Sequence, residues 1–537
     1  GSQYLELKSI AIDSSGNVYA SGRFKGPMVV AGKDFESRKY KGKYYYDLFA
    51  LKLDSDGDLK WIEAWGGVGE DDLTDIAVGP DGNLFLVGHL QRGGHLDPES
   101  YKAWVNGADL SNEYLGESRR TALGAFVLKL DPNGKKEFAK PWGVPSENNL
   151  GNTKALRVAI QADGTVISVA TFTKRIVVAT VEGSKEYIGD PKNGRQTGLL
   201  RAINGVTGQY EWHKQFRTNV NKVDIVPRAL TLGPAGDIYV GGSFRHTQKD
   251  TKFSLKRLVD PSDDRTSIPL DSNGSGALWT QVNSAFLLKT NEDGEGRWAY
   301  QWGATNSRPR PLAQVNDISV APNGDVIVVG GFKGTLRFHE GSQLRQLESV
   351  GTKANPFMMR LNPYGGYKWA NSLKSTSQFH VYEVETGSDG HLYVSGAFAT
   401  GSTNKAEFNP TSPAGLGRVE LSSERYGHLN GFVARYEADG KLDGASYVDD
   451  STTPVGWDLI RGPTNDEEII GSSAEVVLGE PLCAGGRWEF DRPPGLAVRN
   501  YLVDQQKLAS SGKSVGEFIE DTFNDGLSTV PDYNIFW

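Results

Sequence analysis

The chain repeats one pattern of apolar and polar positions along most of its length. In each copy an alternating apolar strand leads to a glycine-containing turn, and a second strand ends near Gly-x-Phe. Apolar residues that alternate with polar ones are typical of β-strands. The copies are SIAIDSSGNVYASGRF from Ser9, DIAVGPDGNLFLVGHL from Asp75, RVAIQADGTVISVATF from Arg157, ALTLGPAGDIYVGGSF from Ala229, DISVAPNGDVIVVGGF from Asp317 and EVETGSDGHLYVSGAF from Glu383, with a degenerate seventh, DLIRGPTNDEEIIGSSA, from Asp458. The pattern therefore predicts a series of β-hairpins.

A second hairpin follows each clear copy, as in FALKLDSDGDLKWIEAWGG from Phe49 and FLLKTNEDGEGRWAYQWG from Phe286. Two hairpins supply four strands, which make one blade of a β-propeller, and a closed ring of blades leaves only short edges. The units therefore predict an all-β fold, a seven-bladed β-propeller of four-stranded antiparallel blades over residues 5–503. Its blades are expected to start near residues 8, 73, 154, 226, 314, 380 and 455.

The last segment, residues 504–537, is expected to complete the ring. Too few residues precede the first blade for the N-terminus to supply a full outer strand to the seventh. The segment carries a capping box, Ser514-x-x-Glu517, ahead of the apolar Phe518 and Ile519, which predicts one short helix. It ends in Tyr-Asn-Ile-Phe-Trp, a candidate for the ring-closing strand. A docking peptide for a partner is the alternative.

Residues at the turns are expected to have structural roles. The glycine of each tight turn supplies the positive φ that hairpin turns require. The acidic run Asp54, Asp56 and Asp58 resembles a calcium loop, but Trp65 stands where that loop needs a glutamate, so a hairpin turn is the better interpretation. Aromatic residues that follow the second turn are expected to pack between neighbouring blades; these are Trp61, Phe138, Trp212, Trp298 and Trp369.

The spacing of the turn glycines shows where the repeat varies. From the first turn to the second within a blade the separation ranges from 41 to 58 residues, whereas from there to the next blade it ranges only from 25 to 30. The variable part is the link between the two hairpins of a blade. These links share one face of a propeller, so long insertions and function are expected on that face. The links span residues 25–46, 91–121, 173–197, 245–283, 333–355, 399–429 and 474–495.

Composition narrows the function classes. The chain has 537 residues, a formal charge of -8 and a pI near 5.7, which argues against a general nucleic-acid binder. No apolar run is long enough to predict a transmembrane segment. Cys483 is the single cysteine, so no disulfide or thiolate zinc site can form within one chain, and neither a metal nor a cofactor is expected. The opening Gly1-Ser2 is typical of a cloning remnant, which leaves a signal peptide or lipid anchor open.

The motif Asp/Pro-x-Gly-Asn/Asp-x-Tyr-x-x-Gly-x-Phe, followed by Phe-x-x-Lys/Arg-Leu-Asp-x-x-Gly-x-x-x-Trp, resembles the SBBP-type β-propeller repeats of bacterial surface and secreted proteins. The likeness covers residues 5–503 and implies the fold, together with a secreted, periplasmic or cell-surface location. It implies no single function, because one fold hosts many. The unit that ends at Trp212 is similar to the tryptophan-docking repeat of quinoprotein propellers. The adjacent cysteine pair of many quinoprotein dehydrogenases cannot occur here, which makes such an enzyme an unfavourable interpretation.

The insertions carry the candidate binding residues. In the first link, tyrosines interleave with basic residues: Arg38, Lys39, Tyr40, Lys41, Lys43, Tyr44, Tyr45 and Tyr46. Rigid tyrosine rings beside cations suit a sugar, a polyanion or a protein partner. Alternatively, the tyrosines pack beneath the loop while the lysines stay solvated. Other aromatic and basic candidates on the same face are Tyr101, Trp104 and Tyr114 in the second link and His246 and Trp279 in the fourth.

No catalytic motif is recognisable in the sequence, and the 8 histidines are dispersed. The favoured hypothesis is therefore a non-catalytic extracytoplasmic module that presents a loop-built face to a glycan, a surface polymer or a protein partner. One alternative is a carbohydrate-active hydrolase or lyase with acid and base residues over the central channel. Another is an architectural subunit of a surface assembly.

Overall fold

The computed structural model describes residues 4–30, 33–67, 69, 71–91, 123–141, 144–145, 152–180, 183–188, 196–216, 224–246, 258–259, 282–305, 311–340, 343–387, 390–399, 406–408, 419–421, 429–448 and 460–461. Every regular element in these ranges is a β-strand. The all-β prediction is therefore confirmed.

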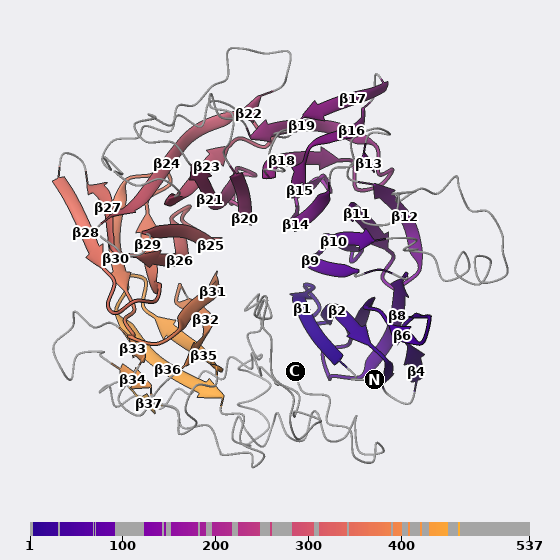
Figure 1. The fold of residues 1–537 in the computed structure, drawn as a ribbon, viewed down its shortest axis with the longest axis horizontal. Helices are drawn as coiled ribbons and strands as arrows, with labels where there is room; N and C mark the ends of the chain where they lie inside the picture. The colour runs from indigo at the N-terminus through magenta and orange to yellow at the C-terminus, as the bar shows by residue number, and fades with distance from the viewer. Residues whose placement is uncertain are drawn as a thin grey trace.

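Six four-stranded antiparallel blades stand round a common centre in the described ranges, which makes the protein a β-propeller (Figure 1). The blades are β1 (Tyr4–Ile12), β2 (Val18–Lys25), β7 (Asp47–Leu53) and β8 (Leu59–Gly66) in blade 1; β9 (Asp72–Val78), β10 (Leu84–Gln91), β11 (Leu123–Leu130) and β12 (Lys136–Pro141) in blade 2; β14 (Thr153–Ile160), β15 (Val166–Thr173), β18 (Gln196–Ile203) and β19 (Tyr210–Phe216) in blade 3; β20 (Asp224–Leu232), β21 (Ile238–His246), β23 (Val282–Thr290) and β24 (Gly296–Thr305) in blade 4; β25 (Leu312–Val320), β26 (Val326–Lys333), β29 (Asn355–Leu361) and β30 (Tyr367–Ser372) in blade 5; and β31 (Phe379–Thr386), β32 (Leu392–Ala399), β35 (Leu429–Tyr436) and β36 (Leu442–Val448) in blade 6. The first strand of each blade lies innermost (Figure 1).

Each innermost strand carries a β-bulge at the same place in the repeat. The residues that the register skips are Lys8, Thr74, Leu156, Arg228, Asn316 and Tyr382. The bulge brings a backbone carbonyl of the innermost strand against the second strand. At Gly330 of blade 5, an added Cβ would lie only 2.0 Å from the Gln314 carbonyl oxygen. This approach explains the glycine of the Gly-x-Phe motif in blade 5, because a Cβ at position 330 would collide with the carbonyl. Blade 3 has the same bulge with Ala170 at this position, opposite Leu199 instead of a phenylalanine.

The tight turns behave as the sequence predicts. The first-turn glycines (Gly16, Gly82, Gly164, Gly236, Gly324 and Gly390) and the second-turn glycines (Gly57, Gly134, Gly208, Gly294, Gly365 and Gly440) all have positive φ. In the acidic turn of blade 1, the Asp54 carboxylate accepts hydrogen bonds from the backbone N–H groups of Asp56 (3.0 Å) and Asp58 (2.9 Å). The aspartate therefore holds the turn itself, as expected of a hairpin.

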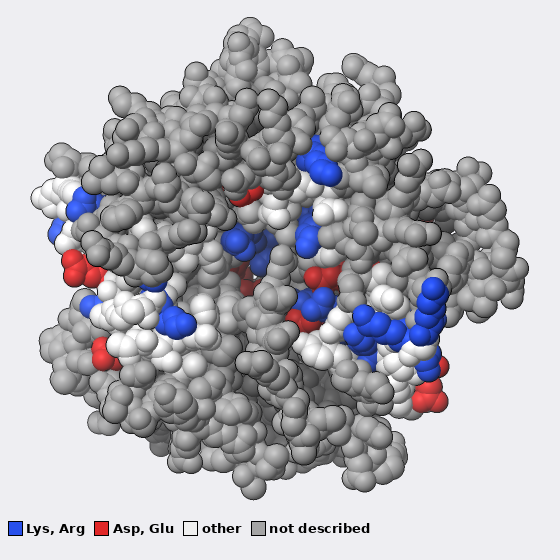
Figure 2. Space-filling model, in the orientation of Figure 1, with Lys and Arg blue, Asp and Glu red and all other residues white. Residues whose placement is uncertain are grey.

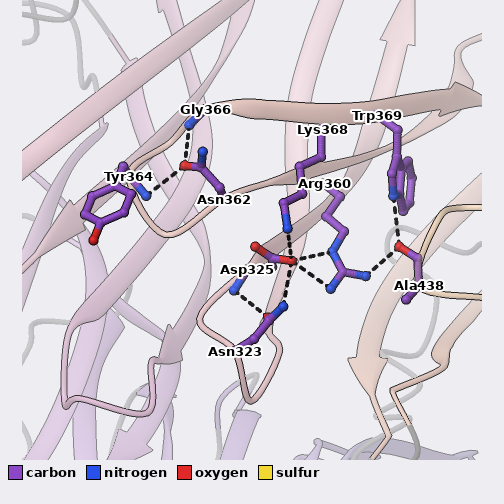
Figure 3. Close-up of polar contacts among 9 residues, drawn as sticks. All are labelled: Asn323, Asp325, Arg360, Asn362, Tyr364, Gly366, Lys368, Trp369 and Ala438. Carbon is purple, nitrogen blue, oxygen red and sulfur yellow. Dashed lines mark hydrogen bonds and ion pairs between the residues drawn. The ribbon is translucent and has the colours of Figure 1, made fainter.

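Aromatic side chains lock each blade to the next, which confirms their predicted position. The Trp369 Nε1–H of blade 5 donates a 3.0 Å hydrogen bond to the Ala438 carbonyl in the second turn of blade 6 (Figure 3). Trp61 makes the same bond to Pro132 of blade 2, also at 3.0 Å. The indole of Trp369 lies against Gly440, where an added Cβ would come within 2.8 Å of the ring. The apolar clusters likewise combine residues of neighbouring blades, so the core lies between the blades.

The links between hairpins contain short hairpins of their own in the described ranges. These are β3 (Pro27–Val30) with β4 (Lys33–Glu36) and β5 (Lys39–Tyr40) with β6 (Lys43–Tyr44) in blade 1, β16 (Arg175–Thr180) with β17 (Gly183–Ile188) in blade 3, β27 (Thr335–Glu340) with β28 (Gln343–Glu348) in blade 5, and β33 (Ala406–Phe408) with β34 (Val419–Leu421) in blade 6. Two more short strands, β13 (Val144–Pro145) and β22 (Leu258–Val259), lie between blades 2 and 3 and in the link of blade 4. The sequence predicts links, not strands, where these short hairpins lie.

The predicted seventh blade, the tail of residues 504–537 and Cys483 lie outside the described residues, except for β37 (Ile460–Arg461). This strand pairs with β36 at the outer edge of blade 6. The seventh blade, expected to start near residue 455, stays a prediction.

Candidate functional site

Two of the groups of charged side chains on the face drawn in Figure 2 lie at blade 1 and at the centre of the propeller. Lysine and arginine cluster over blade 1 near β4 and β6, and a second group of both signs surrounds the centre of the ring. The first place contains the tyrosine-rich link that the sequence analysis selected. We call residues 38–46 the basic tyrosine hairpin.

A tight turn shapes the basic tyrosine hairpin. Lys41 and Gly42 have φ of 49° and 79°, the two positive values of a type I′ turn, and Lys39 and Tyr40 pair with Tyr44 and Lys43 across it. The Tyr45 N–H donates to the Arg38 carbonyl at 2.9 Å and closes the base of the hairpin. The hairpin is therefore an ordered platform.

Lysines of the hairpin lie over its own tyrosine rings. The Lys39 Nζ is 4.7 Å from the centroid of the Tyr44 ring, and the Lys43 Nζ is 5.4 Å from that of Tyr45. Both distances are within cation–π range. The Tyr44 hydroxyl donates to Glu36 Oε1 at 2.5 Å, and this hydrogen bond raises the pKa of the Tyr44 phenol. One face of each ring is thus occupied, while Lys39, Lys41 and Lys43 remain exposed.

Tyr46 extends the platform to the first two strands of blade 1, β1 and β2. Its ring contacts two cations of β2, with Arg23 Cζ at 4.4 Å and Lys25 Nζ at 5.0 Å from the centroid. Tyr4 meets the same ring edge to face, with centroids 5.5 Å apart. Each of these cations therefore has an aromatic neighbour, which favours its position by about 0.5–1 kcal/mol at an exposed site and lowers the entropy cost of binding an anion.

Arg38 points into the protein and belongs to the support of the hairpin. It is 7% exposed, and its backbone N–H donates to Asp47 Oδ2 at 2.9 Å. Burial raises the pKa of the Asp47 carboxyl to about 7, although the Arg38 charge and hydrogen bonds from the Arg38 and Gly67 backbone oppose the shift. Blade 5 holds its link in the same way with a neutral side chain, because Asn355 Oδ1 accepts from the Val350 N–H at 2.6 Å.

A compact ion-pair group joins the hairpin to the centre of the ring. Glu6 of β1 binds Lys8 Nζ at 2.5 Å and Arg23 Nε at 2.7 Å. Asp72 of β9 lies 3.8 Å from both cations and so connects blades 1 and 2. Two cations and two carboxylates balance, so the inner end of this surface carries no net charge and the outer end is basic.

The structure brings together five of the predicted binding residues, namely Arg38, Lys39, Tyr44, Tyr45 and Tyr46. Tyr40 lies in β5, but its side chain is outside the described part. His246 ends β21, where its backbone pairs with Val282, and its side chain is likewise outside. Tyr101, Trp104, Tyr114 and Trp279 lie outside the described residues. Sequence reasoning missed Glu6, Lys8, Arg23, Lys25, Asp47 and Asp72, because each lies near the end of a strand or at a bulge where alternation gives no signal.

Among the described residues, no group of three or more His, Cys, Asp or Glu side chains is placed to hold a metal ion. No helix in that part of the chain has the length and apolar character needed to cross a membrane.

Fold and surface together define a β-propeller with a basic tyrosine hairpin on the face that carries the insertions. No protein-family model and no curated protein matches the chain. Among solved structures it is similar to the Dos1 propeller (9% identity, 83% of this chain and 91% of that chain, TM-score 0.35). It is also similar to a PL25 ulvan lyase bound to -[GlcA(1-4)Rha3S]- (10% identity, 80% of this chain and 89% of that chain, TM-score 0.32). A third similar structure is the β-propeller domain of the Trilobed protease from Pyrococcus furiosus (8% identity, 79% of this chain and 99% of that chain, TM-score 0.27). These values are too low to transfer an activity to this chain.

Proposed function

We propose that this protein is a non-catalytic binding module for an acidic glycan, and that the basic tyrosine hairpin is its main contact. The observation that supports the proposal is the position of the lysine ammonium groups over the tyrosine rings. The carboxylates or sulfates of a polysaccharide would meet exposed cations that are already ordered.

The same geometry favours an acidic glycan over a neutral one. A neutral sugar ring binds by stacking on an open aromatic face, and Lys39 and Lys43 each occupy one of the two faces of Tyr44 and Tyr45. An anionic group would bind the two ammonium groups where they stand and would not have to displace them from the tyrosine rings. Each exposed charge contact contributes only about 0.2–1 kcal/mol, so useful affinity requires several along a polymer.

The setting of this function is part of the proposal. The resemblance of the repeats to the SBBP type supports membership of that group of propellers and a place outside the bacterial cytoplasm, where acidic surface polymers occur. A protein partner with an acidic surface would be recognised by the same cations, and the binding experiment distinguishes the two.

Titration calorimetry with a soluble polyuronate and a neutral glucan, in 0.15 M salt, tests the proposal. We expect binding of the polyuronate alone. The double variant Lys39→Glu, Lys43→Glu is expected to weaken it about 2- to 30-fold, from two lost contacts of about 0.2–1 kcal/mol each. Lys135→Glu, an exposed charge change on a tight turn of blade 2, is the matched control and leaves affinity unchanged. Equal affinities for all three proteins, or equal binding of both glycans, would exclude the hairpin as an acidic-glycan site.

One observation supports the alternative function, a carbohydrate-active hydrolase or lyase. Glu6 and Asp72 come from neighbouring innermost strands and share Lys8 and Arg23, so two carboxylates lie near the centre of the ring. Two carboxylates are the minimum for glycosidase chemistry. Incubation of the bound polymer with the protein separates the functions: new reducing ends or unsaturated products that disappear in Glu6→Gln would favour the enzyme, and an unchanged polymer favours binding.

A further inference from the structure

Two exposed tyrosines meet at one turn, at the junction of blades 4 and 5. Tyr364 in the second turn of blade 5 is 85% exposed, and Tyr300 of β24 is 38% exposed. The Tyr300 ring lies against the same turn, because an added Cβ at Gly365 would come within 2.4 Å of it. The link and the second turn of a blade lie at opposite ends of its third strand, so this pair lies on the face opposite the basic tyrosine hairpin.

Both tyrosines depart from the repeat. The residue before the second-turn glycine is polar in the other five blades, which have Asp56, Asn133, Thr207, Asp293 and Asp439 there. The residue two places after the interblade aromatic is polar in the four other blades that have that aromatic, as Glu63, Lys140, Lys214 and Asn371. A single exposed apolar residue is ordinary on a protein surface, whereas two aromatic replacements at one junction favour a binding role.

Tyr300 takes the place of a residue that contacts the next turn. In blade 5 the equivalent residue is Asn371, whose amide N–H donates a 2.8 Å hydrogen bond to the Gly440 carbonyl of blade 6. Tyr300 places a ring there instead. This ring also contacts Trp298, with centroids 5.3 Å apart, and Trp302, at 6.4 Å and an interplanar angle of 11°. An aromatic stack therefore supports Tyr300 from within the blade.

The turn that carries Tyr364 is fixed in place. Asn362 Oδ1 accepts the backbone N–H groups of Tyr364 (2.9 Å) and Gly366 (2.8 Å), and the Tyr364 ring points away from this amide (Figure 3). The Pro363 carbonyl accepts the indole N–H of Trp298 at 3.3 Å, which ties the turn to blade 4. A tyrosine on such a support offers contact area at a low cost in conformational entropy.

We propose that Tyr364 and Tyr300 form a second binding site, separate from the hairpin, for the ring of a neutral sugar. Among the described residues no cation lies over either ring, in contrast to Tyr44 and Tyr45. The open face of Tyr364 therefore offers an apolar surface to the C–H groups of a pyranose. Each phenol also places a hydroxyl at the edge of its ring, where it would meet the sugar hydroxyls.

The size of this surface favours a sugar over a protein partner or a second copy of the chain. At about 150–250 Å² for a tyrosine side chain, the two exposed fractions leave about 200–300 Å². A stable protein interface buries about 800 Å² on each side. One sugar ring, at the affinity per atom of drug-sized ligands, binds with a Kd in the millimolar range. Calorimetry with a glucan does not register binding this weak, so the two sites are measured separately.

Saturation-transfer NMR with cellotetraose, a neutral β-linked oligosaccharide, tests the proposal. We expect transfer to the ring C–H protons of the sugar. Tyr364→Asp introduces the residue that blades 1, 4 and 6 have at this turn position, and it should raise the Kd about tenfold or more. Tyr364→Phe keeps the ring and should keep most of the affinity. Val206→Ala, at an apolar side chain that is 76% exposed in the second turn of blade 3, is the matched control and leaves the Kd unchanged.

Three results would overturn the proposal. Equal Kd values for wild type and Tyr364→Asp would mean that the ring does not bind the sugar. A Kd raised by the double variant Lys39→Glu, Lys43→Glu but not by Tyr364→Asp would assign the sugar to the hairpin. Self-association in sedimentation that Tyr364→Asp abolishes would make the patch a contact with a second copy. Polyuronate affinity is measured independently at the hairpin, so the failure of one site does not bear on the other.

Discussion

Two adjacent glycines of β26 offer a sharp test of the bulge geometry. An added Cβ at Gly330 would lie 2.0 Å from the Gln314 carbonyl oxygen and 2.7 Å from the Phe357 ring, whereas at Gly331 nothing lies within 4 Å. Carbon and oxygen normally approach to about 3.3 Å, so alanine at position 330 must push the innermost strand away by about 1.3 Å. A backbone carbonyl in a bulge cannot rotate aside as a side chain would.

The two alanine variants should therefore differ in sign. Gly330→Ala is expected to lower the free energy of unfolding by about 3 kcal/mol, the upper end of the usual overpacking cost. Gly331→Ala is expected to be neutral or to raise it by up to about 1 kcal/mol, because alanine restricts the unfolded chain and fits the open space. Gly331 is not among the residues with positive φ, so alanine meets no backbone strain there.

Blade 3 supplies a compensating change that extends the test. It places Ala170 opposite Leu199, where blade 5 places Gly330 opposite Phe357. Phe357→Leu in the Gly330→Ala background should therefore recover part of the loss, with a coupling energy of about 1 kcal/mol or more in a double-mutant cycle. Urea unfolding followed by tryptophan fluorescence measures the wild type and the four variants. If Gly330→Ala and Gly331→Ala agree within about 0.5 kcal/mol, the close carbonyl is not what requires glycine in this repeat.

Three further changes test other contacts, each by chemical unfolding. The native pKa of Asp47, raised to about 7 from 3.8, means that native protein keeps a proton which the unfolded chain releases as pH rises, so stability should fall between about pH 4 and 7. Asp47→Asn, which places at position 47 the residue that blade 5 has at Asn355, should remove that pH dependence. The difference in the free energy of unfolding between variant and wild type should then change by about 4 kcal/mol between pH 4 and 7. Parallel pH profiles of the two proteins would contradict the raised pKa of Asp47. Trp61→Phe removes the hydrogen bond to the Pro132 carbonyl and should lower the free energy of unfolding by about 0.5–1.5 kcal/mol. A Trp→Phe change at a site without such a hydrogen bond is the control. If Trp61→Phe loses no stability, the hydrogen bond is not made in solution. Asp325 meets Arg360 Nε at 2.9 Å and Lys368 Nζ at 2.6 Å, and although burial opposes ionisation, hydrogen bonds from Lys368, Asn323 and Arg360 lower its pKa (Figure 3). Asp325→Asn should cost about 3–5 kcal/mol at pH 7 and less as the pH falls below about 4, where the unfolded carboxyl is already protonated; a cost that does not change with pH would contradict the ion pairing.

The repeat made the blades predictable because local rules determine them. Alternation places the strands, and a tight turn needs positive φ, so each predicted turn glycine has it. The interblade position of Trp61 and Trp369 also follows from their recurrence after the second turn. The bulges were not predicted, although the glycine of Gly-x-Phe was their visible sign. A glycine that makes room for a distant carbonyl looks, in sequence, like any other glycine.

The candidate site was only partly predictable because side-chain direction depends on the fold. Arg38 and Lys39 are neighbours in one basic run, yet Arg38 is buried beside Asp47 and Lys39 lies exposed over Tyr44. The acid and the arginine are separated by a whole hairpin, so no local spacing connects them. The cations that hold Tyr46 come from another strand, β2, and were invisible for the same reason.

Link strands that pair with the preceding blade, as β22 does with β19 and β27 with β24, change what insertion length means in this propeller. Blades 1 and 5 have the same separation of 41 residues between their turn glycines, yet they use it differently. Blade 5 builds six-residue strands in β27–β28, whereas blade 1 keeps four-residue strands in β3–β4 and forms the additional hairpin β5–β6. Since β27 already pairs with the neighbouring blade, a long link is no evidence of a binding surface by itself. The residues of a link beyond its first hairpin are the better guide to a binding surface. In blade 1 these residues are the basic tyrosine hairpin.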